Sequence, residues 1–186
     1  MVQSFIFWSW WKKIHILNGG LKKWIFENKP ITTNTTEIIE SNYVVNEKGN
    51  LVISLDQVKK NILSKSFNVI DARSLERFEG KVSEPRKGLR SGHIQNSICL
   101  PFSLCINQKT GEFKNLEELR ELFNQHENIE KRLDPVFTCG SGVTAAVLAY
   151  AYKMVNNDYI PKIYDGSWSE YGKYPAWKLQ KKLPYF

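Results

Sequence analysis

The chain has 186 residues, of which 42% are hydrophobic and 24% charged, a composition typical of one globular domain with or without an added fragment. The composition excludes collagen-like, coiled-coil and wholly disordered chains. The net charge of +7 comes mostly from scattered lysines, so it predicts no nucleic-acid partner. The longest apolar run, residues 5–11, is shorter than the roughly 20 residues that cross a bilayer, so we expect no membrane span.

The first 42 residues predict a small fragment followed by a linker. Residues 13–20 are typical of a short buried strand running into a glycine turn, and residues 21–28 of a helix with Leu21, Trp24 and Ile25 on one face. Residues 30–42 are rich in Thr, Asn and Glu without periodicity, which indicates a linker.

Beyond the linker, apolar stretches predict strands at residues 67–71, 98–101, 136–138 and 162–164. Periodic stretches predict helices between them. This alternation predicts an α/β domain, a parallel sheet with helices on both faces.

The sequence also predicts where the helices begin and which side chains they bury. Two helices begin with capping boxes, Ser54 with Gln57 and Asn115 with Glu118. The third, residues 143–154, is apolar almost all round and is predicted to be buried. The expected inward residues of the first two helices are Leu55, Val58, Ile62, Leu63, Leu116, Leu119, Leu122 and Phe123.

Cys139 lies in a loop suited to nucleophilic chemistry. Ligands of parallel sheets bind beyond the carboxyl ends of the strands, which singles out residues 71–73 and Cys139. Residues 139–144, CGSGVT, join a strand to a helix, so backbone amides and the helix N-terminus would favour a thiolate. The alternative is an inert buried cysteine. Cys99, within a strand, and Cys105 are expected to have no catalytic role, and their spacing predicts neither a zinc site nor a disulfide.

Arginine is concentrated next to this region. Four of the six arginines, Arg73, Arg77, Arg86 and Arg90, lie between residues 73 and 90, although lysine is the usual cation of the chain. The cluster indicates positions that need a planar, bidentate fork, or alternatively a solvated basic loop.

A phosphotyrosine phosphatase also has a cysteine loop that opens a helix. That class needs an arginine at the end of the loop, as C-x5-R, to clamp phosphate. Ala145 occupies this position. The arginine that would bind phosphate is therefore missing, and the phosphatase hypothesis is disfavoured.

Several separated motifs together resemble one family. CGSGVTA at 139–145 with YDGSW at 164–168, preceded by NVIDARSLERFEG, EPR and SGHIQNSICLPF, resemble the C-terminal domain of two-domain rhodanese-type sulfurtransferases. The resemblance covers residues 44–177 and implies the rhodanese fold with a persulfide carried on Cys139. The implied organisation is a remnant of a preceding rhodanese domain (1–30), a linker (31–43), the rhodanese domain (44–178) and a tail (179–186).

The resemblance also implies a sulfur donor. Gly140 and Ser141 are uncharged, similar to 3-mercaptopyruvate sulfurtransferases rather than to thiosulfate enzymes, which carry cations there. Arg77 and Arg86 match the two arginines that bind the mercaptopyruvate carboxylate. Mercaptopyruvate is therefore the expected donor, with thiosulfate second.

The implied roles are simple and require no cofactor or metal. Cys139 attacks the donor sulfur, and the loop, through Gly140, Gly142, Val143 and the hydroxyls of Ser141 and Thr144, binds the anionic sulfur. Thioredoxin or a small thiol then accepts the sulfur, in mitochondria or cytoplasm.

Two further residues near the loop receive expected roles. Asp71 is expected either to orient the arginine loop or only to cap its turn. We expect His93 to be a structural turn residue rather than a base.

Residues 10–30 resemble the last elements of the N-terminal domain, the rest of which the sequence lacks, including an aspartate and a histidine that relay a proton to the loop serine in the mercaptopyruvate enzymes. The aromatic residues before them would form an exposed apolar patch. We expect residues 1–30 to dock on a protein partner, as half of a split protein. The alternatives are an incomplete gene model and a weakly active or inactive subunit with a structural role in a larger assembly.

Overall fold

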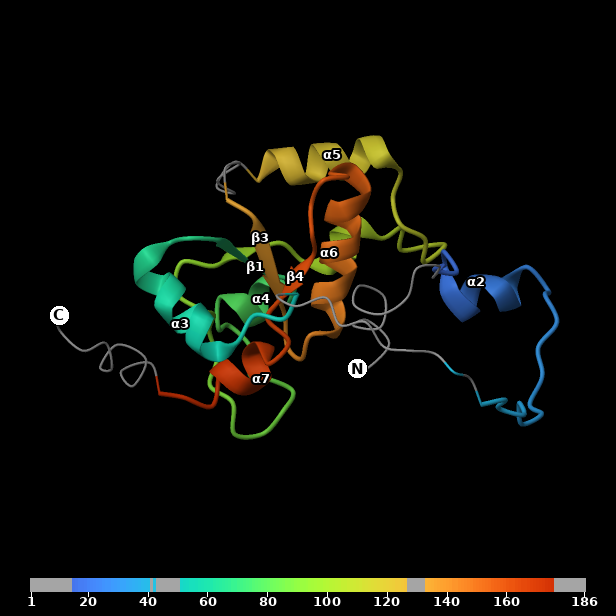
Figure 1. Ribbon diagram of the computed structural model, residues 1–186, viewed down its shortest axis with the longest axis horizontal. Coiled ribbons are helices and arrows are strands. Elements are labelled where there is room, and N and C mark those ends of the chain that lie inside the picture. Colours follow the sequence, from blue (N-terminus) through green and yellow to red (C-terminus); the bar gives the residue numbers. More distant parts are fainter. Residues whose placement is uncertain (1–14, 41, 43–50, 127–132, 176–186) are drawn as a thin grey trace.

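The computed structural model describes residues 15–40, 42, 51–126 and 133–175 (Figure 1). Its sheet has four parallel strands in the order β2-β1-β3-β4. Each strand lies inside or next to a stretch that the sequence predicts. The strands are β1 (Asn68–Asp71), β2 (Ile98–Cys99), β3 (Pro135–Thr138) and β4 (Lys162–Ile163).

The predicted helices are also present, and both capping boxes are confirmed. The Gln57 amide donates to Ser54 Oγ over 3.3 Å, and Asn115 Oδ1 accepts from the Glu118 amide over 2.9 Å. Three short elements are not predicted by the sequence: the helices α4 and α7 and the 3-10 helix η1. The helices are α2 (Gly20–Phe26), α3 (Leu55–Ser64), α4 (Leu75–Phe78), η1 (Phe102–Cys105), α5 (Leu116–Gln125), α6 (Val143–Val155) and α7 (Ser167–Tyr171).

Helices cover both faces of the sheet, as the sequence predicts (Figure 1). On one face, Val69 and Val136 pack with Val58 of α3 and with Trp168 and Tyr171 of α7. On the other, alternate strand residues pack against α5, α6 and η1, among them Ile70, Phe137, Leu119, Leu148 and Cys105. The period of two along β1 and β3 therefore divides the core into two layers.

Three residues predicted to be buried are exposed. Leu63 is 67% exposed because it lies on the side of α3 opposite the buried Asn61. Leu116 shares the inward face of α5 but lies in its first turn, beyond the core, and is 43% exposed. Val143 is 47% exposed because α6 buries a stripe that starts at Ala145.

The strand predicted at residues 13–20 is wrong in its described part. Residues 15–17 form no strand and are exposed, because they pair with no strand of the described sheet. The segment instead contacts the loop closed by the Ile106–Phe113 bridge: Asn18 Oδ1 accepts from the Phe113 amide over 2.9 Å, and Lys23 pairs with Glu112.

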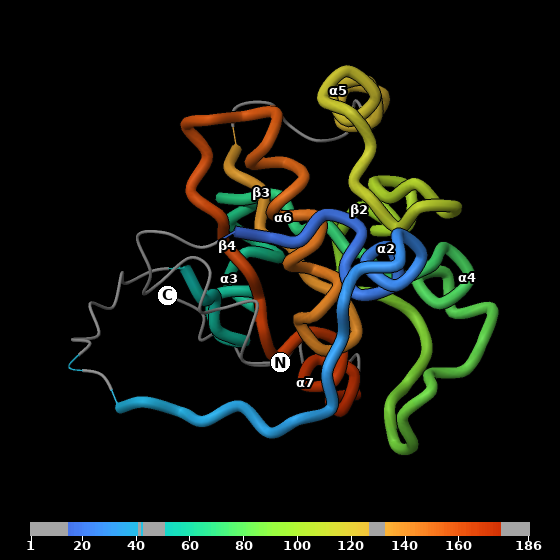
Figure 2. The backbone as a smooth tube through the Cα atoms, turned by 90° about the vertical axis from the view of Figure 1, so that its right-hand side faces the viewer, coloured from blue at the N-terminus to red at the C-terminus, as the bar shows by residue number. Residues whose placement is uncertain are grey.

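Helix α2 follows where the sequence predicts a helix, but it buries none of its residues. Figure 1 shows α2 and the segment after it at one side of the domain, and in Figure 2, which is viewed from that side, they lie in front of it. Residues 29–40 contain no helix or strand and are exposed.

Predictions for residues 1–14, 41, 43–50 and 176–186, including the aromatic patch and the tail, lie outside the described residues. Among the described helices, none is long and apolar enough to span a membrane.

Candidate active site

The two strand ends singled out by the sequence are neighbours. Strands β1 and β3 pair in parallel with Asp71 opposite Thr138, and the Ala72 amide donates to the Thr138 carbonyl over 2.8 Å. The arginine-rich segment and the cysteine loop therefore leave the sheet side by side at its carboxyl edge.

Cys139 is 2% exposed, and its sulfur accepts a hydrogen bond from the Ser141 amide over 3.4 Å. The loop leads directly into α6, whose first amides have no acceptor within the helix. Such amides, at the positive end of the helix dipole, stabilise an anionic sulfur. Gly140, Ser141, Gly142, Val143 and Thr144 form the rest of this loop and the first turn of α6, and the Ser141 amide contacts the thiol sulfur.

Gly142 is required by the turn that opens α6. Its φ of +82° disfavours other residues, and a Cβ there would lie 2.3 Å from Asp165 Oδ1. Burial, together with the nearby Glu170, raises the pKa of Asp165.

The buried Ser167 hydroxyl holds the cysteine loop in place by hydrogen bonds to its backbone amides. Its Oγ accepts from the amides of Cys139 (3.2 Å) and Gly142 (3.0 Å) and donates to the Tyr164 carbonyl (2.8 Å). The next amides of α7 bind the loop carbonyls, Trp168 to Cys139 over 2.9 Å and Ser169 to Gly140 over 3.0 Å. Helix α7 therefore holds the loop at both ends.

Arg77 and Arg86 lie against Gly140. A Cβ at Gly140 would be 3.0 Å from Arg77 Nη2 and 3.6 Å from Arg86 Nη1. The missing side chain leaves room for both guanidinium groups beside the loop. The structure thus brings the two predicted carboxylate-binding residues next to the predicted nucleophile.

A chain of buried ion pairs supports Arg77. Asp71 binds Arg73 through Nε and Nη2 (2.7 Å to Oδ2), Arg73 Nη1 donates to Glu84 (2.8 Å), and Glu84 accepts from Arg77 Nη2 (2.6 Å). Burial opposes the Arg73 charge, but its hydrogen bond and ion pair with Asp71 outweigh this, and the Arg73 pKa is raised. Asp71 Oδ1 also accepts from the Arg73 amide over 3.0 Å. Asp71 therefore both caps the turn and holds Arg73.

The arginine cluster is not a solvated loop throughout. Arg73 is 2% exposed. Arg90 stacks on Trp168 with 4.5 Å between guanidinium carbon and ring centroid, and burial lowers the Arg90 pKa. Planar, stacking guanidinium chemistry accounts for these two positions.

The other candidate residues have structural surroundings. Burial raises the thiol pKa of both Cys99 and Cys105 to about 12, so both remain protonated at neutral pH. His93 Nδ1 lies 2.9 Å from the Phe78 carbonyl, and its ring stacks on Phe78, as expected for a turn residue.

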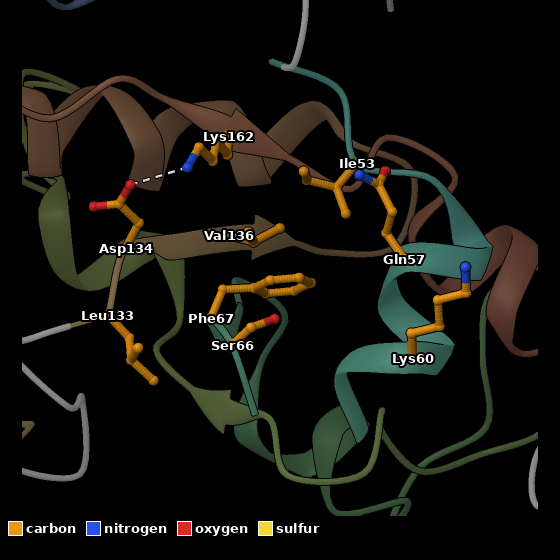
Figure 3. A pocket seen from close by; sticks show the side chains of 9 residues that line it. All are labelled: Ile53, Gln57, Lys60, Ser66, Phe67, Leu133, Asp134, Val136 and Lys162. Atoms are coloured by element: carbon orange, nitrogen blue, oxygen red, sulfur yellow. Dashed lines mark hydrogen bonds and ion pairs between the residues drawn. The ribbon is translucent and has the colours of Figure 1, made fainter. Parts of the chain in front are cut away.

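An open hollow of about 670 Å³ lies away from this site, where strand β3 begins (Figure 3). It contains none of the predicted site residues, and its Lys162 and Asp134 are paired over 2.9 Å. Its lining is Ile53, Gln57, Lys60, Ser66, Phe67, Leu133, Asp134, Val136 and Lys162. The cysteine loop at the opposite ends of the strands remains the candidate active site.

Sequence reasoning assigned no role to Glu84, Asp165 or Ser167. The sequence did contain a signal for Asp165 and Ser167. They lie just after strand β4, which neighbours β3, and ligands of parallel sheets bind beyond the carboxyl ends of the strands. Glu84 lies in a loop, and only its contacts with Arg73 and Arg77 in the folded chain reveal its role.

Comparisons with known proteins identify the family of the chain. A family model described as "Rhodanese-like domain" matches residues 54–174, and the chain belongs to that family. Human 3-mercaptopyruvate sulfurtransferase is 34% identical, over 85% of this chain and 52% of its own length. The Arabidopsis thaliana thiosulfate/3-mercaptopyruvate sulfurtransferase 1, mitochondrial, is 34% identical, over 94% of this chain and 51% of its own.

Among solved structures, the 3-mercaptopyruvate sulfotransferase SseA from Escherichia coli matches with a TM-score of 0.74 and 29% identity, covering 91% of this chain and 62% of that one. The predicted fold is confirmed. The chain spans about half the length of the curated relatives it matches.

Proposed function

We propose that this chain is a sulfurtransferase that moves sulfur from 3-mercaptopyruvate, or from thiosulfate, through a persulfide on Cys139 to a thiol acceptor. The observation that carries the proposal is the contact of two guanidinium groups with Gly140, next to the Cys139 thiol. An anionic sulfur donor needs a nucleophilic sulfur and a carboxylate clamp within one small molecule's length, and this arrangement offers both. The sulfurtransferase names of the relatives support the same chemistry.

The proposed reaction has two steps. The Cys139 thiolate attacks the donor sulfur, the carbon–sulfur bond breaks, and its electrons leave on a pyruvate enolate that takes up a proton. The outer sulfur, bound by the loop amides and the hydroxyls of Ser141 and Thr144, is then attacked by the thiolate of thioredoxin or a small thiol, which restores Cys139. With thiosulfate, the sulfur–sulfur bond breaks and sulfite leaves.

In this proposal, Arg77 and Arg86 bind the donor carboxylate by charge-assisted hydrogen bonds. Gly140 and Ser141 add no charge beside Cys139, which suits a monoanionic 2-oxo acid better than a dianion. We propose a mitochondrial or cytoplasmic location, which the name of the Arabidopsis relative supports in part.

We further propose that residues 1–30 are a remnant of a preceding rhodanese domain, and that these residues dock on a second polypeptide resembling that domain. Two observations support this: α2 buries none of its residues, and the match to the Arabidopsis relative extends well beyond residues 54–174. The partner would also bring the aspartate and histidine that the resemblance implies for Ser141.

Mass spectrometry of the full chain after treatment with mercaptopyruvate tests the proposal. We expect one added sulfur on Cys139 and none in Cys139→Ser. The yield should be unchanged in Cys99→Ser, because the Cys99 thiol of the unmodified chain is protonated and does not react. Sulfur on Cys99 or Cys105 would contradict the site assignment. No added sulfur, with and without a supplied N-terminal half, would contradict the activity.

A further inference from the structure

Glu84 is a buried carboxylate that holds two arginines at once. Its side chain is 1% exposed. Oε1 accepts from Arg73 Nη1 over 2.8 Å and Arg77 Nε over 3.2 Å, while Oε2 accepts from Arg77 Nη2 over 2.6 Å. Both carboxylate oxygens are therefore occupied, and the Arg77 fork is fixed in position.

The same contacts determine the charge that the site offers to an anion. Asp71 and Glu84 offset two of three arginine charges, those of Arg73 and Arg77. Within the described part of the chain, no carboxylate pairs with Arg86, which is exposed. The cluster of these five side chains therefore carries one net positive charge.

An acidic residue at the other end of the cysteine loop, Asp165, does not add to this positive charge. Asp165 lies at Gly142, whereas the three atoms nearest to a Cβ at Gly140 all belong to Arg77 and Arg86. A bound carboxylate at Gly140 would thus meet two guanidinium groups, one oriented by Glu84 and one without a compensating carboxylate among the described residues. That combination matches a monoanion with a planar, bidentate head group.

We propose that Glu84 determines the charge selectivity of this site, favouring monoanionic carboxylates over dianions, an inference that rests on the proposed function for the identity of the donor. Removing one negative charge beside the bound anion strengthens the Coulomb attraction for a dianion twice as much as for a monoanion. Glu84 would thereby make the site favour 2-oxo acid donors over dianionic donors such as thiosulfate.

The test measures binding of pyruvate, a monoanion, and sulfate, a dianion, to the full chain by calorimetry. Neither anion carries a transferable sulfur, so the result does not depend on turnover. In Glu84→Gln we expect the ratio of sulfate to pyruvate affinity to rise about tenfold. Glu79→Gln is the matched control: it removes a carboxylate from the same region, but one that is paired with Lys81 and exposed, and its ratio should stay within about twofold of the wild type.

A second variant separates charge from position, and circular dichroism shows whether each variant folds. Glu84→Asp keeps the charge but shortens the side chain, so both affinities should fall while their ratio is kept. If Glu84→Gln does not fold, Glu84→Asp tests the inference instead. A ratio of sulfate to pyruvate affinity that rises in Glu84→Asp would overturn a role of Glu84 through its charge.

The outcomes separate this inference from the proposed function. An unchanged ratio in folded Glu84→Gln, or a wild-type chain that binds neither anion, overturns the selectivity inference. Anion selectivity that follows Glu84 in a chain that forms no persulfide supports the inference and contradicts only the proposed activity.

Discussion

Gly140 brings the nucleophile and the arginines into one small volume. Its missing side chain lets Arg77 Nη2 approach to 3.0 Å of the Cβ position, and Glu84 holds Arg77 there. Among the residues that the structure describes, no carboxylate pairs with Arg86, which is exposed. The two arginines therefore contribute differently, Arg77 as an oriented fork and Arg86 as the uncompensated charge.

Replacing Arg86 with alanine should weaken the use of mercaptopyruvate without unfolding the chain. A charge-assisted hydrogen bond is worth about 1.5–3 kcal/mol, so kcat/KM should fall by roughly 10- to 150-fold. Steady-state kinetics measure this, with Arg120→Ala, an exposed arginine of α5, as the control. Equal losses in the two variants, or thiosulfate turnover above mercaptopyruvate turnover in the unmodified chain, would contradict the carboxylate-binding role.

Ser167→Ala should both destabilise the chain and slow persulfide formation. The change leaves the amides of Cys139 and Gly142 without their acceptor and the Tyr164 carbonyl without its donor. Each buried group left unpaired costs about 1–3 kcal/mol. Denaturant unfolding and mass spectrometry of Cys139 measure the two effects. Wild-type stability in this variant would show that the hydroxyl does not hold the loop.

At the scale of elements, the loop from β3 to α6 depends on one backbone conformation. Gly142→Ala should cost more than strain alone, since φ is +82° and the new Cβ would meet Asp165. Gly88→Ala is the matched control: its φ is +80°, but nothing lies within 4 Å of the new Cβ. The control should lose about 1–2 kcal/mol, and Gly142→Ala clearly more, in the free energy of unfolding. Equal losses would mean that Asp165 moves aside freely.

The sequence predicts those helices and strands that depend on side chains close together in the chain. The two capped helices and the four strands follow from side chains a few residues apart, as the Ser54–Gln57 box shows. Helices α4 and α7 have four and five residues, too few to show a period of 3.6. The roles of Glu84 and Ser167 escaped prediction because each depends on partners brought together by folding. The strand predicted near residue 15 failed for the same reason, since a strand requires a neighbour.

The stability of the whole molecule should fall at alkaline pH, because its core buries thiol and phenol groups in their neutral, protonated form. Burial raises the thiol pKa of Cys99 and Cys105 to about 12, and it also raises the phenol pKa of Tyr159 and Tyr164. In the unfolded chain, thiols ionise near about 8.5 and phenols near about 10. Above these values the unfolded state loses protons that the folded state keeps. Stability is therefore fully present below about pH 8.5 and falls as pH rises toward 12.

Each such group should lower the free energy of unfolding by about 1.4 kcal/mol per pH unit once it is ionised only in the unfolded state. Urea unfolding between pH 8 and pH 11 measures the slope. Cys105→Ala removes one of the groups and should flatten the curve by about that amount per unit above pH 9. A slope unchanged by Cys105→Ala would show that this thiol ionises equally in both states.

The exposed apolar side chains of α2 predict a docking surface for the second polypeptide proposed above. Leu21 and Ile25 are 64% and 51% exposed, and burying such a side chain is worth about 1.5–3 kcal/mol. We expect the full chain to form a one-to-one complex with a separately expressed amino-terminal rhodanese-like half of a relative. Ile25→Glu should weaken that complex by about 10- to 100-fold, while Leu63→Glu, on the exposed side of α3, should leave it unchanged. Sedimentation velocity measures both affinities. A chain that stays monomeric beside that half, or two variants that weaken the complex equally, would show that α2 is not the docking surface.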